Sequence, residues 1–139
     1  MLNKVLIPID DSQTSKWVVE HSRHLLERPG TSVKLFSVVD ESLPADRTSV
    51  PTLERLQLLK NELALKGIQA ETELVVGDPA ERILREIGAH GYDLVVMATH
   101  GRTGLPRLLF GSVALKVMLG SSAPILLLRP LFRPGGSIS

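Results

Sequence analysis

Short apolar runs alternate with helical patterns along the whole chain. The predicted strands are residues 4–10, 32–40, 68–76, 92–98 and 123–129. Between them, apolar residues recur at helical spacing, and the predicted helices are residues 12–28, 53–67, 78–91 and 111–120. Strands that alternate with helices require crossover connections, so the pattern predicts an α/β fold, a doubly wound parallel sheet with helices on both faces.

Local signals fix the ends of several of these elements. The stretch "GDPAERI" places Asp78 as an N-cap, Pro79 at the first helical position and Glu81 where a capping-box partner belongs. Ser12 is the expected cap of the first helix, and Gly67 is expected to end the second.

Apolar stripes on the first two helices predict their buried faces. The first helix carries Trp17 and Val18 on one face together with His21, and Trp17 is assigned to the core. The second helix repeats leucine at helical spacing, and this stripe is also expected to be core: Leu53, Leu56, Leu59 and Leu63.

Composition narrows the class of protein. A chain of 139 residues with 43% hydrophobic residues is expected to form one domain over 1–130, with 131–139 as a flexible tail. Aromatic residues make up only 4%, which argues against a base-stacking surface for nucleic acid. The chain has no cysteine, its N-terminus does not resemble a signal peptide, and no apolar run reaches membrane-spanning length. We therefore expect a cytoplasmic protein without nucleic-acid or membrane partners.

The net charge of +1 hides an asymmetry along the chain. Residues 1–93 contain 11 Lys and Arg against 15 Asp and Glu, whereas residues 94–139 contain five cations and no carboxylate. Either the cations of this acid-free segment only keep it soluble, or they form part of a binding site for an anion.

A glycine-rich loop with an arginine follows the fourth predicted strand. Gly101 and Gly111 allow a ligand to approach the backbone closely, and Gly111-Ser112 begins a helix whose free N–H groups favour an anion. Arg102 adds a charged donor, so phosphate is the ligand that fits. The motifs GxxxxGK[ST] and GxGxxG are absent, and a plain turn ahead of a helix is the alternative interpretation.

The carboxyl ends of parallel strands are where such a ligand binds. The residues expected there are Asp10, Asp11 and Ser12, then 38–41, then Gly77-Asp78, then 98–112.

The chain resembles the universal stress protein family over nearly its whole length. The family pattern Gly-x2-Gly-x9-Gly-Ser corresponds to Ala98 through Gly101, the nine residues "RTGLPRLLF", and then Gly111-Ser112. The segments "LIPIDDS", "LFSVVDE", "VVGDPAERI", "YDLVVMATHGRTGL" and "APILLLR" follow the family in order and spacing. Only residues 42–52 and the tail after Arg129 lie outside the resemblance.

The resemblance implies an adenine-nucleotide α-hydrolase-like fold with strand order 3-2-1-4-5, and an ATP site. Asp10 would contact the nucleoside, Val38 would present its backbone to the base, and the glycine loop and the next helix would surround the phosphates. The residues expected to bind ATP are Pro8, Ile9, Asp10, Val38, Met97, Ala98, His100, Gly101, Arg102, Gly111, Ser112 and Val113. Ala98 replaces the first glycine of the pattern, so its methyl group would lie against the ribose and phosphate.

Other polar residues have weaker functional interpretations. His21 and His24 lie three apart on one predicted helix but lack a third metal ligand, so a solvated face is favoured. His100 is assigned to binding or structure rather than proton transfer. Asp10 and Asp11 could hold Mg²⁺ beside a triphosphate, although Asp11 before Ser12 also suits a helix start.

Three functions remain open at this point. The first is an ATP-binding stress-response regulator, a homodimer through the C-terminal strand, with at most slow ATP hydrolysis and no assigned catalytic residue. The second is a nucleotide-free interaction module of the same fold. The third, an adenylyl-transferring enzyme, ranks last because "PIDDSQTS" replaces the SGGxDS-type loop of that group.

Overall fold

The computed structural model describes residues 2–10, 13–42, 52–98 and 111–128. These residues form a parallel sheet of five strands in the order β3-β2-β1-β4-β5. The strands are β1 (Lys4–Pro8), β2 (Ser32–Val39), β3 (Gln69–Val76), β4 (Leu94–Ala98) and β5 (Ile125–Leu128). The predicted fold class and strand order are confirmed.

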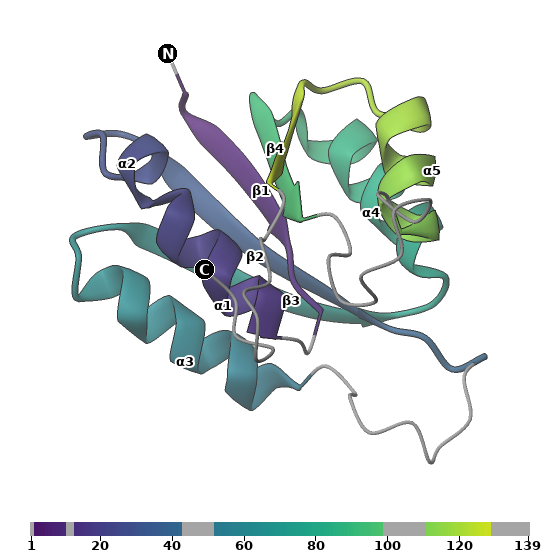
Figure 1. Ribbon diagram of the computed structural model, residues 1–139, viewed down its shortest axis with the longest axis horizontal. Coiled ribbons are helices and arrows are strands. Elements are labelled where there is room, and N and C mark those ends of the chain that lie inside the picture. Colours follow the sequence, from purple (N-terminus) through teal and green to yellow (C-terminus); the bar gives the residue numbers. More distant parts are fainter. Residues whose placement is uncertain (1, 11–12, 43–51, 99–110, 129–139) are drawn as a thin grey trace, which may run out of the picture.

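Helices cover both faces of the sheet (Figure 1). One face carries α1 (Gln13–His21), α2 (Arg23–Leu26) and α3 (Leu53–Ala64), and the other carries α4 (Pro79–His90) and α5 (Ser112–Gly120). Side chains of a strand alternate between the faces, so Val5 and Ile7 join the core beneath α1 and α3, and Leu6 joins the core beneath α4 and α5. Both cores consist mainly of aliphatic residues.

The predicted N-cap and first-turn proline of α4 are confirmed, while the Glu81 carboxylate, expected as a capping-box partner, pairs with Arg85 at 3.1 Å. The Asp78 carboxylate accepts a hydrogen bond from the Glu81 N–H at 2.9 Å, and Pro79 occupies the first turn. The helix ends at Gly91, whose φ is +61° and whose N–H donates to the Ile87 carbonyl. These caps place the start of α4 directly after β3.

Gly67 ends α3 in a Schellman motif. Its φ is +77°, its N–H donates to the Ala64 carbonyl, and the N–H of Ile68 donates to the Leu63 carbonyl. A Cβ atom at Gly67 would meet nothing within 4 Å, so the backbone angle alone selects glycine.

Gly67→Ala is therefore expected to lower the free energy of unfolding by about 1–2 kcal/mol, because alanine is strained at this φ. Gly88→Ala is the matched control, since Gly88 lies inside α4 with nothing within 4 Å of an added Cβ. That variant is expected to gain about 0.5–1 kcal/mol from its helix propensity. Urea unfolding of both variants measures the contrast, and changes of the same sign would contradict it.

Two expectations about the helices are wrong. The predicted first helix is broken at Ser22, whose buried hydroxyl donates to the Val18 carbonyl at 2.7 Å, so His21 and His24 lie on different helices. Leu53, expected in the core stripe of α3, is 56% exposed because it lies in the first turn, beyond the buried positions. Trp17 is only partly buried and stacks on His21 with ring centroids 4.0 Å apart.

In the part of the chain that the structure describes, no helix has both the length and the apolar character needed to cross a membrane.

Candidate functional site

The carboxyl ends of β1, β2 and β4 lie next to one another at one edge of the sheet. β1 pairs with β2 on one side and with β4 on the other, so the order of the strands reverses at β1. The crevice outside such a reversal is the usual ligand site of an open parallel sheet. Asp10 follows β1 and Ala98 closes β4, so the fold brings both to this edge, as expected.

Two hydrogen bonds hold the chain in place between β1 and Asp10. The ladder between β1 and β2 ends at Pro8 opposite Phe36. The Ile9 N–H then donates to the Phe36 carbonyl at 2.8 Å, and the buried Ser37 hydroxyl donates to the Ile9 carbonyl at 2.5 Å. Asp10, the next residue, is exposed and stands beside the end of β2.

Val38 and Met97 contribute to this edge through their backbones. Their side chains are 8% and 6% exposed and belong to the core beneath α4 and α5. Ala98 is partly buried and packs against the opposite core. A ligand over the strand ends would therefore meet main-chain atoms at Val38 and Met97.

The first turn of α5 offers backbone donors at the same edge. Because β4 and β5 are parallel, α5 runs antiparallel to them and begins on the carboxyl side of the sheet. Gly111 is the N-cap, and its carbonyl accepts the Leu115 N–H at 3.0 Å. Ser112 is exposed, Val113 packs on the core, and no acidic residue lies in the first turn. A helix start of this kind favours an anion.

Several expected site residues fall outside the described part of the chain. These are His100, Gly101 and Arg102, together with Asp11 and Ser12. Among the expected site residues that the structure describes, Asp10, Val38, Ala98 and the Gly111-Ser112 helix start come from elements that end or begin at one edge of the sheet.

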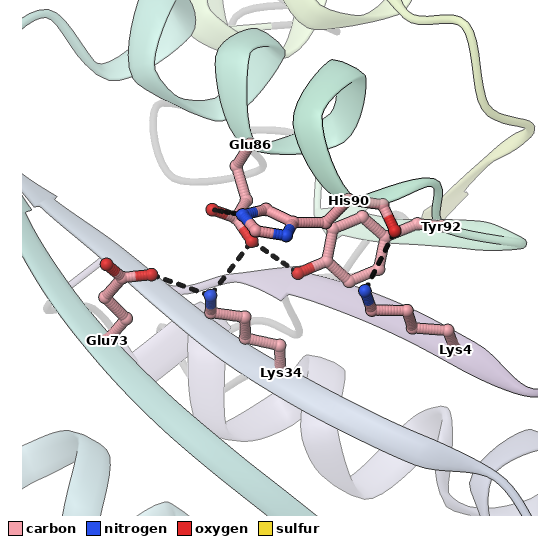
Figure 2. Close-up of polar contacts among 6 residues, drawn as sticks. All are labelled: Lys4, Lys34, Glu73, Glu86, His90 and Tyr92. Atoms are coloured by element: carbon pink, nitrogen blue, oxygen red, sulfur yellow. Dashed lines mark hydrogen bonds and ion pairs between the residues drawn. The ribbon is translucent and has the colours of Figure 1, made fainter.

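A second polar cluster, which the sequence did not suggest, lies between the sheet and α4 (Figure 2). The Lys34 ammonium on β2 bridges two carboxylates, Glu73 on β3 at 2.7 Å and Glu86 on α4 at 2.9 Å. The Tyr92 hydroxyl donates to Glu86 at 2.5 Å, and His90 Nε2 lies 3.7 Å from the same carboxylate. We call these five residues the ion cluster.

Mutual hydrogen bonds keep Glu86 and Lys34 charged despite their burial. Burial opposes the charge of Glu86, but the hydrogen bonds from Tyr92 and Lys34 outweigh it and lower the pKa of the carboxyl. Burial likewise opposes the charge of Lys34, but Glu73 and Glu86 outweigh it and raise the pKa of the ammonium. Burial and the bond to Glu86 raise the pKa of Tyr92, which keeps its hydroxyl protonated as a donor.

The ion cluster is a structural feature rather than a ligand site, since its charges are paired within the fold. It ties the edge strand β3 and the helix α4 to the middle of the sheet. Among the described residues, no group of three or more His, Cys, Asp or Glu side chains could hold a metal ion. The reversal of strand order at β1 makes the carboxyl edge the candidate site.

The sequence profile of the universal stress protein family matches residues 1–129. The chain belongs to the universal stress protein family. Universal stress protein MJ0531 of Methanocaldococcus jannaschii is 32% identical, over 93% of this chain and 83% of its own length.

Solved structures of the family share the fold. The structure of MJ0577, a universal stress protein of the same archaeon, aligns with a TM-score of 0.79 and 26% identity over 96% of this chain and 99% of that one. A universal stress protein in complex with cAMP aligns with a TM-score of 0.73 at 18% identity, over 91% of this chain and 97% of that one. The Archaeoglobus fulgidus protein in complex with dAMP aligns with a TM-score of 0.63 at 18% identity, over 89% of this chain and 95% of that one. Two proteins of this fold thus bind adenine nucleotides.

Proposed function

We propose that this protein binds ATP at the carboxyl edge of the sheet and acts as a cytoplasmic regulator in a stress response. The observation that carries the proposal is the pairing of β1 with β4, which brings Asp10 and Ala98 to the same edge at which α5 begins. The family's glycine spacing from Ala98 to Ser112 supports it, as do the cAMP and dAMP complexes of proteins with this fold.

Four of the expected residues have a defined part in the proposed site. Asp10 contacts the nucleoside, and the backbone of Val38 contacts the base. The phosphates, with any accompanying Mg²⁺, lie against the start of α5 at Gly111 and Ser112, where free N–H groups favour negative charge. The remaining proposed contacts are Pro8, Ile9, Met97, Ala98, His100, Gly101, Arg102 and Val113.

The protein is proposed to bind and signal rather than to turn over substrate. Among the described residues that are proposed to contact ATP, Asp10 is the only carboxylate, and the buried Val38 and Met97 offer main-chain atoms. ATP hydrolysis at such a site would be slow at most. The nucleotide-free alternative is favoured by one observation, the Ala98 methyl group in place of a glycine.

Acid extraction of the purified protein, followed by chromatography, tests the proposal against that alternative. We expect an adenine nucleotide in the extract, and titration calorimetry of the stripped protein is expected to show tighter binding of ATP than of GTP. An empty extract together with no heat of ATP binding would favour the interaction module.

We further propose that two copies pair through β5. β5 is an edge strand, and its four residues are only partly buried: Ile125, Leu126, Leu127 and Leu128. An apolar edge with unpaired backbone groups is prone to aggregate, and pairing with a second copy about a two-fold axis removes it.

Leu127→Pro is expected to convert the dimer into a monomer. The Val95 N–H donates to the Pro124 carbonyl at 2.9 Å, and N–H groups alternate along a strand, so the N–H of Leu126 faces β4 and that of Leu127 faces away from the sheet. Proline at 127 removes a donor that faces away from the other strands of the described sheet, where a second copy would pair.

The matched control is Leu127→Ala, which removes the same core side chain but keeps the N–H. Light scattering is expected to give twice the mass of one chain for the wild type and for the alanine variant, and the mass of one chain for the proline variant. A wild-type monomer at high micromolar concentration would contradict pairing through β5.

A further inference from the structure

Ser37 is a buried polar residue near the carboxyl end of β2, an interior strand of the sheet. Its side chain is 1% exposed, and its neighbours in β2 are the apolar residues Phe36 and Val38. A valine or alanine would suit such a position, because a buried hydroxyl is unfavourable unless it is hydrogen-bonded. The sequence therefore places a hydroxyl here where packing does not require one.

The Ser37 hydroxyl acts on the residue that follows β1 rather than on its own strand. It donates to the Ile9 carbonyl at 2.5 Å, while the Ile9 N–H donates to the Phe36 carbonyl at 2.8 Å. The regular ladder has ended one residue earlier at Pro8. The peptide between Ile9 and Asp10 is thus held by a side chain at the point where strand pairing stops.

We propose that Ser37 is a positioning residue for the nucleoside end of the site, an inference that rests on the proposed function. By fixing the Ile9 carbonyl, it orients the peptide that leads into Asp10 and so sets the direction in which the Asp10 side chain leaves the backbone. Without this bond, the peptide before Asp10 would have to be ordered when the ligand binds, and the affinity for the nucleoside would fall.

The experiment compares Ser37→Ala with Ser22→Ala, a close structural control. Ser22 is also 1% exposed, and its hydroxyl also donates to a backbone carbonyl, that of Val18 at 2.7 Å, but it lies at the junction of α1 and α2. Both variants lose one buried hydrogen bond of the same type and are expected to lose similar stability in urea.

Only Ser37→Ala is expected to weaken binding. Calorimetry should show a loss of about three- to tenfold, equal for adenosine and ATP because Asp10 lies on the nucleoside side. Ser22→Ala should bind both ligands as the wild type does. Ser37→Thr retains a hydroxyl and should recover most of the affinity. Amide hydrogen exchange without ligand should become faster at Ile9 in Ser37→Ala.

Two different failures can be told apart. A wild-type protein that binds neither adenosine nor ATP overturns the proposed function and this role with it. A wild-type protein that binds both, with Ser37→Ala no weaker than Ser22→Ala, overturns the positioning role alone. Unchanged exchange at Ile9 in Ser37→Ala also overturns it.

Discussion

Replacing Glu86 with alanine is expected to lower the free energy of unfolding by about 3–5 kcal/mol, because it leaves buried partners unpaired. The Glu86 side chain is 8% exposed, and its carboxylate accepts from Lys34 at 2.9 Å and from Tyr92 at 2.5 Å. Its loss leaves Lys34 with Glu73 alone and removes the acceptor of the buried Tyr92 hydroxyl. Urea unfolding at neutral pH measures the change.

Two controls distinguish the contribution of the ion cluster to stability from that of an ordinary surface ion pair. Glu81→Ala on the same helix removes an exposed pair with Arg85, and is expected to cost only about 0.5 kcal/mol. The double variant Lys34→Met with Glu86→Gln removes both charges but keeps an acceptor for Tyr92, and is expected to recover most of the loss. A Glu86→Ala variant no less stable than Glu81→Ala would contradict this account.

The stability that the ion cluster provides is expected to depend on pH in a defined window. The folded-state pKa of Glu86 lies below its usual value of 4.5, so its contribution is present above that value and is lost as the pH falls through the folded-state pKa. The pKa of Lys34 is raised above 10.5, so its contribution is present below that value and is lost as the pH rises further. The difference in the free energy of unfolding between the wild type and Glu86→Ala should therefore become smaller at both low and high pH.

Arg102→Ala is expected to weaken ATP binding by about ten- to a hundredfold while sparing adenosine, because in the proposed site it removes a charged hydrogen bond to phosphate. Asp10→Ala should weaken both ligands alike, since Asp10 is assigned to the nucleoside. Gly111→Val should weaken ATP more than Arg102→Ala does. The φ of Gly111 is −64°, which any residue can adopt, so valine should leave the start of α5 intact. The loss of ATP affinity would then show that the valine side chain blocks the approach of the ligand to the backbone. Calorimetry with ATP and adenosine measures all three variants.

Lys116→Ala is the matched charge control, because it removes one cation from the same acid-free segment at an exposed position on α5. Its effect on ATP binding should be small and should shrink further as salt is added. Equal losses of ATP and adenosine in Arg102→Ala would show that the glycine loop does not recognise phosphate.

Local chemistry made much of the fold predictable. The N-cap at Asp78 and the glycine stops at positions 67 and 91 act within one helical turn, so the sequence alone contains their partners. The order of the strands came instead from the family resemblance, because the alternation of strands and helices predicts a parallel sheet without its order.

The ion cluster could not be predicted because its members meet only in the folded chain. Lys34 and Glu86 are 52 residues apart, and their contact needs both the register of β2 and the seating of α4 on the sheet. In the sequence, Lys34 resembles an outward-facing polar position of a strand. Ser37 was missed for the same reason, since its partner Ile9 is 28 residues away.

For the candidate site too, the residues could be named from the sequence, but their placement together depends on the fold. The resemblance named its residues, and the topology brings Asp10 and Ala98 to one edge through the pairing of β1 with β4.

The break at Ser22 was missed because a single serine hydroxyl, bonded to the preceding turn, ends a helix whose apolar pattern continues beyond it.

We propose that an adenine nucleotide binds where β1, β2 and β4 end and α5 begins. Following the amide NMR spectrum during a titration with ATP tests both the binding and its place. We expect saturable shifts, largest at Ile9, Asp10, Val38, Ala98 and Ser112, with α3 unaffected. An unchanged spectrum at millimolar ATP, or shifts confined to residues away from this edge, would contradict the account.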